Sequence, residues 1–149
     1  MMTTRRDFIR AALLASGGVL ANARGADGTD EGHDAWFMPS EGSKHKRTWM
    51  AFGAGAEIWG DDLLPGVRNC LATIAKTISR YEPVSMLVRD DDVAMALELV
   101  GAKVELIVCP MDDLWIRDTG PVFVVSKKGG KAGIDFNFNG WGEKQEYGL

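Results

Sequence analysis

The sequence predicts an α/β fold on the basis of three observations. Apolar runs of strand length occur at residues 48–52, 84–88 and 103–109. The segments between them carry apolar residues at helical spacing. Residues 122–125 and 133–138 are expected to pair around a Lys-Lys-Gly-Gly turn. The order strand, helix, strand, helix, strand, hairpin is typical of α/β domains, and the chain contains neither a Gly-x-Gly-x-x-Gly motif nor a phosphate loop, which argues against a dinucleotide fold.

The first 23 residues predict an export signal. Arg5 and Arg6 precede an apolar stretch over residues 11–20, and Ala-Asn-Ala at residues 21–23 provides the small-x-small pattern that a signal peptidase requires. This arrangement is typical of a twin-arginine signal, so we expect use of the Tat export machinery and a periplasmic or extracellular location. A membrane-spanning helix needs about 20 apolar residues, roughly twice what is present, so no stable membrane anchor is expected.

Residues 24–35 are predicted to form a flexible linker, because Gly, Asp, Thr and Glu dominate them. The folded domain is therefore expected to occupy residues 36–149. The whole chain has a formal net charge of −4, and removal of residues 1–23 leaves −6. An acidic domain argues against nucleic acid and anionic lipid as partners and is compatible with a cationic ligand.

A long helix is predicted after the first strand and a loop at residues 53–60. Asp61 or Asp62 can cap it, and Pro65 lies in its first turns, where proline is tolerated. We expect one face to be buried as far as about Arg80. The apolar residues on that face are Leu63, Leu64, Val67, Leu71, Ile74, Ala75 and Ile78.

A second helix is predicted over residues 93–100. Three aspartates at residues 90–92 precede it, and carboxylates at a helix N-terminus interact favourably with its free N–H groups. We therefore interpret this triplet as a helix start in preference to a metal site. Gly101 is expected to end the helix.

Both cysteines are predicted to be buried. Cys70 falls within the first helical pattern, and Cys109 ends an apolar strand. Neither has a His or Cys at metal-ligand spacing, so metal binding is not expected. An exported protein permits a disulfide, but their positions on separate elements give no reason to propose one.

Residues 112–121, Asp-Asp-Leu-Trp-Ile-Arg-Asp-Thr-Gly-Pro, place three carboxylates, an arginine and a tryptophan where the third strand meets a loop. Alternation along an extended chain would send Asp113, Trp115 and Arg117 to one side. Carboxylates beside an aromatic ring suit a planar cation such as a guanidinium. The alternative interpretation is an Asp113–Arg117 ion pair that fastens the loop, followed by a Thr-Gly-Pro turn.

Four segments are distinctive when taken together. They are Met38-Pro39-Ser40-Glu41 with His45, Thr48-Trp49-Met50-Ala51, Trp115-Ile116-Arg117-Asp118-Thr119-Gly120-Pro121 and Asp135-Phe136-Asn137-Phe138-Asn139-Gly140-Trp141-Gly142. In this order the chain resembles the agmatine deiminase and bacterial peptidylarginine deiminase family from residue 36 to its end. Four segments in register are far more specific than any one of them.

The resemblance implies a guanidine-modifying enzyme of the pentein fold, in which ββαβ-type units surround a central site like propeller blades. About one unit and the start of the next would be present here. No metal or organic cofactor is implied. In that family a cysteine thiolate attacks the guanidinium carbon, a histidine assists proton transfer, ammonia leaves, and water hydrolyses the thiouronium intermediate to a ureido product.

The resemblance also implies roles for particular residues. Asp118 closes the Trp-x-Arg-Asp motif and matches the family's guanidinium-binding aspartate. Trp115 matches its pocket tryptophan, with packing as the alternative role. Asp113 is a second substrate-binding candidate, with pairing to Arg117 as its alternative. The Thr-Gly-Pro turn begins beside Asp118, so strand alternation need not hold there.

The family's catalytic histidine and nucleophilic cysteine lie beyond its Trp-Gly segment, and neither Cys70 nor Cys109 matches the nucleophile. We therefore expect both groups to lie beyond Leu149 and this chain to be a truncated N-terminal part that is inactive by itself. The alternative is a non-catalytic remnant or a module that binds guanidino compounds. The sequence does not choose between agmatine and peptidyl-arginine as substrate, although export slightly favours the second.

Overall fold

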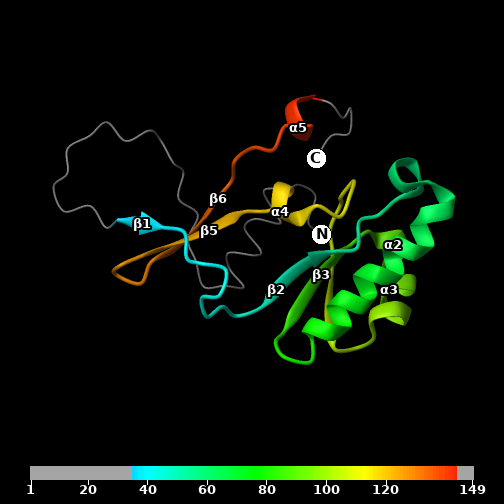
Figure 1. Cartoon of the computed structure of the whole chain (residues 1–149), viewed down its shortest axis with the longest axis horizontal. Coiled ribbons are helices and arrows are strands. Elements are labelled where there is room, and N and C mark those ends of the chain that lie inside the picture. The colour runs from blue at the N-terminus through cyan, green and yellow to red at the C-terminus, as the bar shows by residue number, and fades with distance from the viewer. Residues whose placement is uncertain (1–34, 144–149) are drawn as a thin grey trace.

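The computed structural model describes residues 35–143, so the predicted signal at residues 1–23 and nearly all of the predicted linker lie outside the described part. Two three-stranded sheets organise it, in the orders β2-β3-β4 and β1-β5-β6 (Figure 1). The strands are β1 (Trp36–Phe37), β2 (Thr48–Ala51), β3 (Val84–Val88), β4 (Val104–Val108), β5 (Val122–Ser126) and β6 (Lys131–Ile134). The helices are α2 (Ala56–Ile78), the 3-10 helix η1 (Asp90–Asp92), α3 (Val93–Val100), α4 (Ile116–Thr119) and α5 (Gly140–Glu143). The predicted α/β class is confirmed.

The sheet β2-β3-β4 is parallel, with Met50 opposite Met86 and Met86 opposite Leu106. Each parallel neighbour requires a helical crossover, which α2 and α3 provide. Such crossovers are right-handed, so consecutive ones place their helices on the same face of the sheet. Figure 1 shows α2 and α3 side by side on that face. All of β3 is buried, which agrees with its uninterrupted run of mostly apolar residues.

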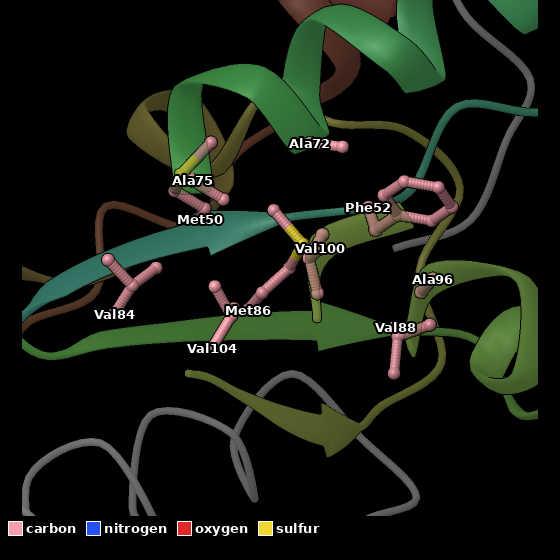
Figure 2. Packing of buried hydrophobic residues seen from close by; sticks show 10 residues of the cluster. All are labelled: Met50, Phe52, Ala72, Ala75, Val84, Met86, Val88, Ala96, Val100 and Val104. Carbon is pink, nitrogen blue, oxygen red and sulfur yellow. The ribbon is translucent and has the colours of Figure 1, made fainter. Parts of the chain in front are cut away.

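The main core lies between this sheet and the two helices (Figure 2). Ala72, Ala75 and Ala96 are buried on the helices, and their small side chains allow a close approach to the strands. Figure 2 shows Ala72 and Ala75 on the helix above Met50 and Met86. The buried cluster consists of Met50, Phe52, Ala72, Ala75, Val84, Met86, Val88, Ala96, Val100 and Val104.

The prediction for α2 needs two corrections. The helical run starts at Ala56, earlier than predicted, and it is interrupted at Gly60, whose φ is 68°. Leu63 and Ile74 are 63% and 49% exposed, whereas burial was predicted for both. The buried stripe is rotated toward Ala72 and Ala75, with Leu71 and Ile78 packed partly buried beside it, so that Leu63 and Ile74 are left outside. No helix within residues 35–143 is both long and apolar enough to span a membrane.

The second sheet contains the predicted hairpin. Val122 pairs with Ile134, and Gly129 adopts a φ of 85° in the turn. The second strand ends at Ile134, not at residue 138 as predicted. The Asn137 N–H is bonded to Asp135 Oδ1 at 2.8 Å, and Asn137 has a φ of 52°. This side-chain turn replaces the sheet hydrogen bonds and ends the strand. Strand β1, which pairs with β5, was not predicted.

The two cysteines have different surroundings. Cys109 is 3% exposed, so its predicted burial is confirmed. Cys70 is exposed on α2, so the same prediction for Cys70 is wrong, because it lies on the side of the helix away from the sheet. Neither cysteine forms a disulfide within residues 35–143.

Candidate functional site

The candidate site lies at the carboxyl edge of the sheet β2-β3-β4. The strands are parallel, so the segments that follow them, residues 52–59, 89–92 and 109–115, lie at one edge. Open α/β sheets bind ligands at this edge, because loops there can present side chains from several strands. The predicted site residues at positions 113, 115 and 118 belong to the last of these segments and the turn after it.

The 112–121 segment is not extended as predicted. Ile116–Thr119 form the helical turn α4. The N–H groups of Asp118 and Thr119 donate to the Trp115 carbonyl at 3.0 and 3.1 Å, and the Gly120 N–H donates to the Ile116 carbonyl at 2.8 Å. A Cβ at Gly120 would lie 2.5 Å from that same carbonyl oxygen, so the turn requires glycine there. The turn therefore interrupts strand alternation before Asp118.

Asp113 is held by a tryptophan from another element. Its Oδ1 accepts a hydrogen bond from Trp59 Nε1 at 2.8 Å and one from the Leu114 N–H at 2.8 Å. The alternative role, a pair with Arg117, is wrong, because Arg117 Nη2 lies 2.8 Å from Glu41 Oε1. That pair is largely exposed and contributes little to stability.

Two carboxylate oxygens at this edge are buried without a hydrogen bond within the described residues. They are Asp112 Oδ2 and Asp113 Oδ2. Buried polar atoms in proteins are nearly always bonded, so such a pair calls for an explanation. A ligand that donates hydrogen bonds is one explanation.

Asp112 lies among charges of both signs. Burial raises the pKa of Asp112, and the neighbouring charges of Asp113 and Glu57 raise it further, while Arg89 acts in the opposite direction. Asp112, Asp113 and Glu57 therefore bring three carboxylates together near the Arg89 guanidinium. Such an excess of negative charge attracts a cation.

Two indole rings border the carboxylates. The rings of Trp59 and Trp115 have centroids 6.3 Å apart and are tilted by 31°. Trp115 is 43% exposed, so its ring remains available to a ligand. The structure thus brings together two predicted residues, Asp113 and Trp115, through Trp59. Asp118 is exposed on α4, and its role in substrate binding stays a prediction.

Glu57, Trp59 and Asp112 were not predicted as site residues. The first two lie within the loop predicted at residues 53–60, and the third is one of the charges in the 112–121 segment. Their position was the available signal: Glu57 and Trp59 follow the first strand closely, and residues in that position reach the carboxyl edge of a parallel sheet.

The aspartate triplet precedes a helix, as predicted, but its side chains do not cap that helix. No side-chain cap bond forms at the start of α3. Asp92 accepts hydrogen bonds from Arg68 and Arg89 instead, at 2.8 and 2.9 Å. Within residues 35–143, no group of three His, Cys, Asp or Glu side chains is arranged to hold a metal ion.

A cavity of about 460 Å³ lies elsewhere, between residues 38–49 and 116–123. Four charged residues that line it already pair with one another, Arg117 with Glu41 and His45 with Glu82, both at 2.8 Å. Asp112 and Asp113, which carry the unbonded carboxylate oxygens, do not line this cavity. We therefore place the candidate site at the carboxylates.

Comparisons with known proteins identify the family of the chain. Residues 37–148 match the profile of the Porphyromonas-type peptidyl-arginine deiminase family. A putative agmatine deiminase of Streptomyces coelicolor is 43% identical over 106 residues, which cover 70% of this chain and 31% of the relative. The agmatine deiminase of Stutzerimonas stutzeri is 36% identical over 112 residues, which cover 74% and 30%. The chain spans about a third of the length of these curated relatives.

A solved structure of the agmatine deiminase of Enterococcus faecalis superposes with a TM-score of 0.60 at 26% identity, covering 66% of this chain and 27% of that one. The open sheets described above are part of a pentein-type α/β propeller, the fold of the agmatine deiminases, so the predicted fold is confirmed. The profile match covers most of the folded part, including the strands that position the carboxylates and the turn that follows them. The chain therefore belongs to the Porphyromonas-type peptidyl-arginine deiminase family.

Proposed function

We propose that the full-length parent protein hydrolyses a guanidino group to a ureido group and ammonia, and that the residues described above hold its guanidinium. The observation that carries this proposal is the pair of buried, unbonded oxygens, Asp112 Oδ2 and Asp113 Oδ2. A buried acceptor without a partner costs about 1–3 kcal/mol, and more when it is charged. A guanidinium offers five N–H donors in a planar fork and could satisfy both oxygens at once.

The surrounding side chains suit the same ligand. The indole rings of Trp59 and Trp115 can cover the face of a planar cation. Asp118 follows Trp115 on the exposed turn α4, and we propose that it contributes a further carboxylate to the guanidinium. This assignment comes from the family motif and is supported by its proximity in sequence to the candidate site.

The chemical step needs an activated thiol. A thiolate sulfur would form a bond to the guanidinium carbon, the C–N bond would break with release of ammonia, and water would then displace the sulfur to give the ureido product. Cys109 is buried and donates to the Pro110 carbonyl at 3.4 Å, while Cys70 is exposed on α2. Since neither matches the family's nucleophile, we propose that this chain binds a guanidino compound without converting it.

The substrate is proposed to be a small guanidino compound such as agmatine, because the curated relatives named above are agmatine deiminases. Peptidyl-arginine is the second candidate, because the predicted twin-arginine signal would deliver the protein to the periplasm or the cell exterior. These two substrates share the guanidinium and differ at the other end of the molecule, so binding of each must be compared directly.

Isothermal titration calorimetry of the purified chain with agmatine tests the binding role. We expect binding that is lost in Asp112→Asn and Asp113→Asn and unchanged in Asp91→Asn, an exposed carboxylate from the same sheet edge. Butylamine, which has a cationic end but no guanidinium, should bind at least about tenfold more weakly. Equal affinity for butylamine would refute recognition of the guanidinium.

A coupled assay for ammonia tests the catalytic role. We expect no ammonia from agmatine or from N-acetyl-arginine amide with the 149-residue chain. Turnover that disappears in Cys70→Ser or Cys109→Ser would contradict this expectation and assign the nucleophile to this chain. Comparison of the affinities for the two compounds identifies the preferred substrate class.

A further inference from the structure

Beside the carboxylates lies a buried ion network that the proposed chemistry does not use. Asp92 is 8% exposed, and its two oxygens accept hydrogen bonds from different arginines. Arg68 Nη2 donates to Oδ1 at 2.8 Å, and Arg89 Nε donates to Oδ2 at 2.9 Å. The arginine side chains are 14% and 24% exposed, so solvent screens these bonds only weakly.

Both arginines also hold one backbone carbonyl. Arg89 Nη2 donates to the Ala54 oxygen at 2.9 Å, and Arg68 Nη2 donates to it at 3.3 Å. Ala54 is fully buried in the loop between β2 and α2. Two cationic donors on one carbonyl fix that loop more firmly than a single neutral hydrogen bond would.

The held loop leads directly to the candidate site. A Cβ at Gly53 would lie 2.2 Å from the Asp113 carbonyl oxygen, so the two backbones are in close contact there. A few residues later, Trp59 donates its indole N–H to Asp113. The arginines thus restrain the loop at Ala54, and the 112–121 segment contacts it at Gly53.

Arg89 lies close to the acidic group as well. A Cβ at Gly55 would lie 3.0 Å from Arg89 Nη1 and 2.5 Å from Glu57 Oε2, so both groups approach the same point. The charges that act on Asp112 are Arg89 from the end of β3, Glu57 from α2, and Asp113 from its own segment. Arg89 supplies the positive charge in this set.

We propose that Asp92, Arg68 and Arg89 are positioning residues for the candidate site at Asp112 and Asp113. Asp92 orients the two arginines, whose hydrogen bonds to the Ala54 carbonyl keep Trp59 against Asp113, and Arg89 also places a positive charge beside the carboxylates. The inference rests on the proposed function of that site, and none of the three residues is assigned contact with the substrate.

Three variants separate the two parts of this inference. Arg68→Gln removes one bond to Asp92 and one to Ala54, and Arg89→Gln removes the same kinds of bond together with the charge near Asp112. Arg89→Lys keeps the charge. The first readout is hydrogen exchange of the Trp59 indole N–H by NMR, which needs no ligand. We expect exchange about tenfold or more faster in both glutamine variants.

The second readout is the pH dependence of agmatine binding. The acid limb of the binding curve should move to higher pH in Arg89→Gln, stay unchanged in Arg68→Gln, and return toward the wild-type position in Arg89→Lys. A purely structural role would move the limb equally in both glutamine variants, and that result would overturn the electrostatic part. Unchanged indole exchange in both would overturn the positioning part.

Failure of the proposed function gives a different result. If wild-type protein does not bind agmatine but indole exchange accelerates in the glutamine variants, the carboxylates do not form a guanidinium site and the positioning of Trp59 still stands. Circular dichroism of each variant identifies global unfolding, and Arg89→Lys supplies a folded comparison because it retains the buried cation.

Discussion

Exchange of Asp92 for asparagine should lower the free energy of unfolding by about 3–5 kcal/mol, the usual cost of breaking a buried ion pair from one side. The carboxylate makes two charge-assisted hydrogen bonds, at 2.8 and 2.9 Å, each worth about 1.5–3 kcal/mol. Asparagine retains one acceptor oxygen, but its amide N–H₂ would face an arginine N–H. The two guanidinium groups would then share no anion. The partial exposure of Arg89, 24% of its side chain, favours the lower end of this range.

Urea denaturation followed by tryptophan fluorescence measures this loss. For a small domain the slope is about 1–3 kcal/mol per molar urea, so the midpoint should fall by at least about 1 M. Asp91→Asn is the matched control, because Asp91 is the exposed neighbour in the same 3-10 turn, and it should change stability by less than about 0.5 kcal/mol. A loss below about 1 kcal/mol in Asp92→Asn would show that water replaces the carboxylate, and would refute the view that these arginines are buried restraints.

Three further predictions concern the same edge of the sheet. Trp59→Phe removes the 2.8 Å hydrogen bond to Asp113 and should lower the free energy of unfolding, measured by urea denaturation, by about 1.5 kcal/mol. The loss is limited because the Leu114 N–H still donates to Asp113. An unchanged midpoint would mean that this bond does not stabilise the fold. Gly53→Ala places a Cβ 2.2 Å from a backbone oxygen and should lower the free energy of unfolding by about 1–3 kcal/mol. Gly66→Ala, at a position inside α2 where a Cβ would have no neighbour within 4 Å, should raise it by about 0.5–1 kcal/mol. Similar thermal midpoints for the two variants would contradict the close approach at Gly53. The raised pKa of Asp112 means that its carboxyl group holds a proton more tightly in the folded state than in the unfolded state. The group therefore lowers the free energy of unfolding as the pH rises above 3.8, the ordinary pKa of an aspartate. Asp112→Asn should therefore be more stable than wild type at pH 7 and equally stable near pH 3, while agmatine binding is lost; parallel stability curves against pH would show that the sign is wrong.

The parallel sheet could be predicted from sequence because its signals are local. The strand β3 is a short apolar run between Pro83 and a charged triplet, and Gly101, with a φ of 75°, ends α3 as expected. Each of these features depends on residues within a few positions of one another. Apolar periodicity also located α2, but it could not show that alanines would make the closest contacts with the sheet.

The turn α4 could not be predicted in the same way. Alternation along residues 112–121 indicated an extended chain, whereas the structure shows a turn closed by backbone hydrogen bonds to the Trp115 and Ile116 carbonyls. Arg117 illustrates a related difficulty. Its partner, Glu41, is 76 residues away in sequence, whereas the partner that was considered from the sequence, Asp113, is four residues away. Sequence proximity therefore favoured the wrong ion pair.

Asp92 shows why the site itself could be only half predicted. A carboxylate before an apolar helical run indicates a helix start, and that signal is the same whether the carboxylate caps the helix or binds distant arginines. Its partner Arg68 is 24 residues earlier, in the middle of another helix, where nothing in the pattern distinguishes it from a solvated charge. Which of the two roles Asp92 has depends on the packing of α2 and α3 on one face of the sheet, which brings Arg68 and Arg89 to the same carboxylate and the same carbonyl.

This arrangement also explains how the domain can tolerate an acidic edge. Asp112 and Asp113 each leave an oxygen buried and unbonded among the described residues, and the raised pKa of Asp112 marks its ionised form as less favourable in the folded state. Residues selected only for stability would not be placed so, whereas a site that binds a cation requires them. Arg89 offsets part of this cost, while Asp92 and the Ala54 carbonyl hold its guanidinium group. A ligand cation can then supply the remaining positive charge, so binding and stability should rise together when agmatine is added.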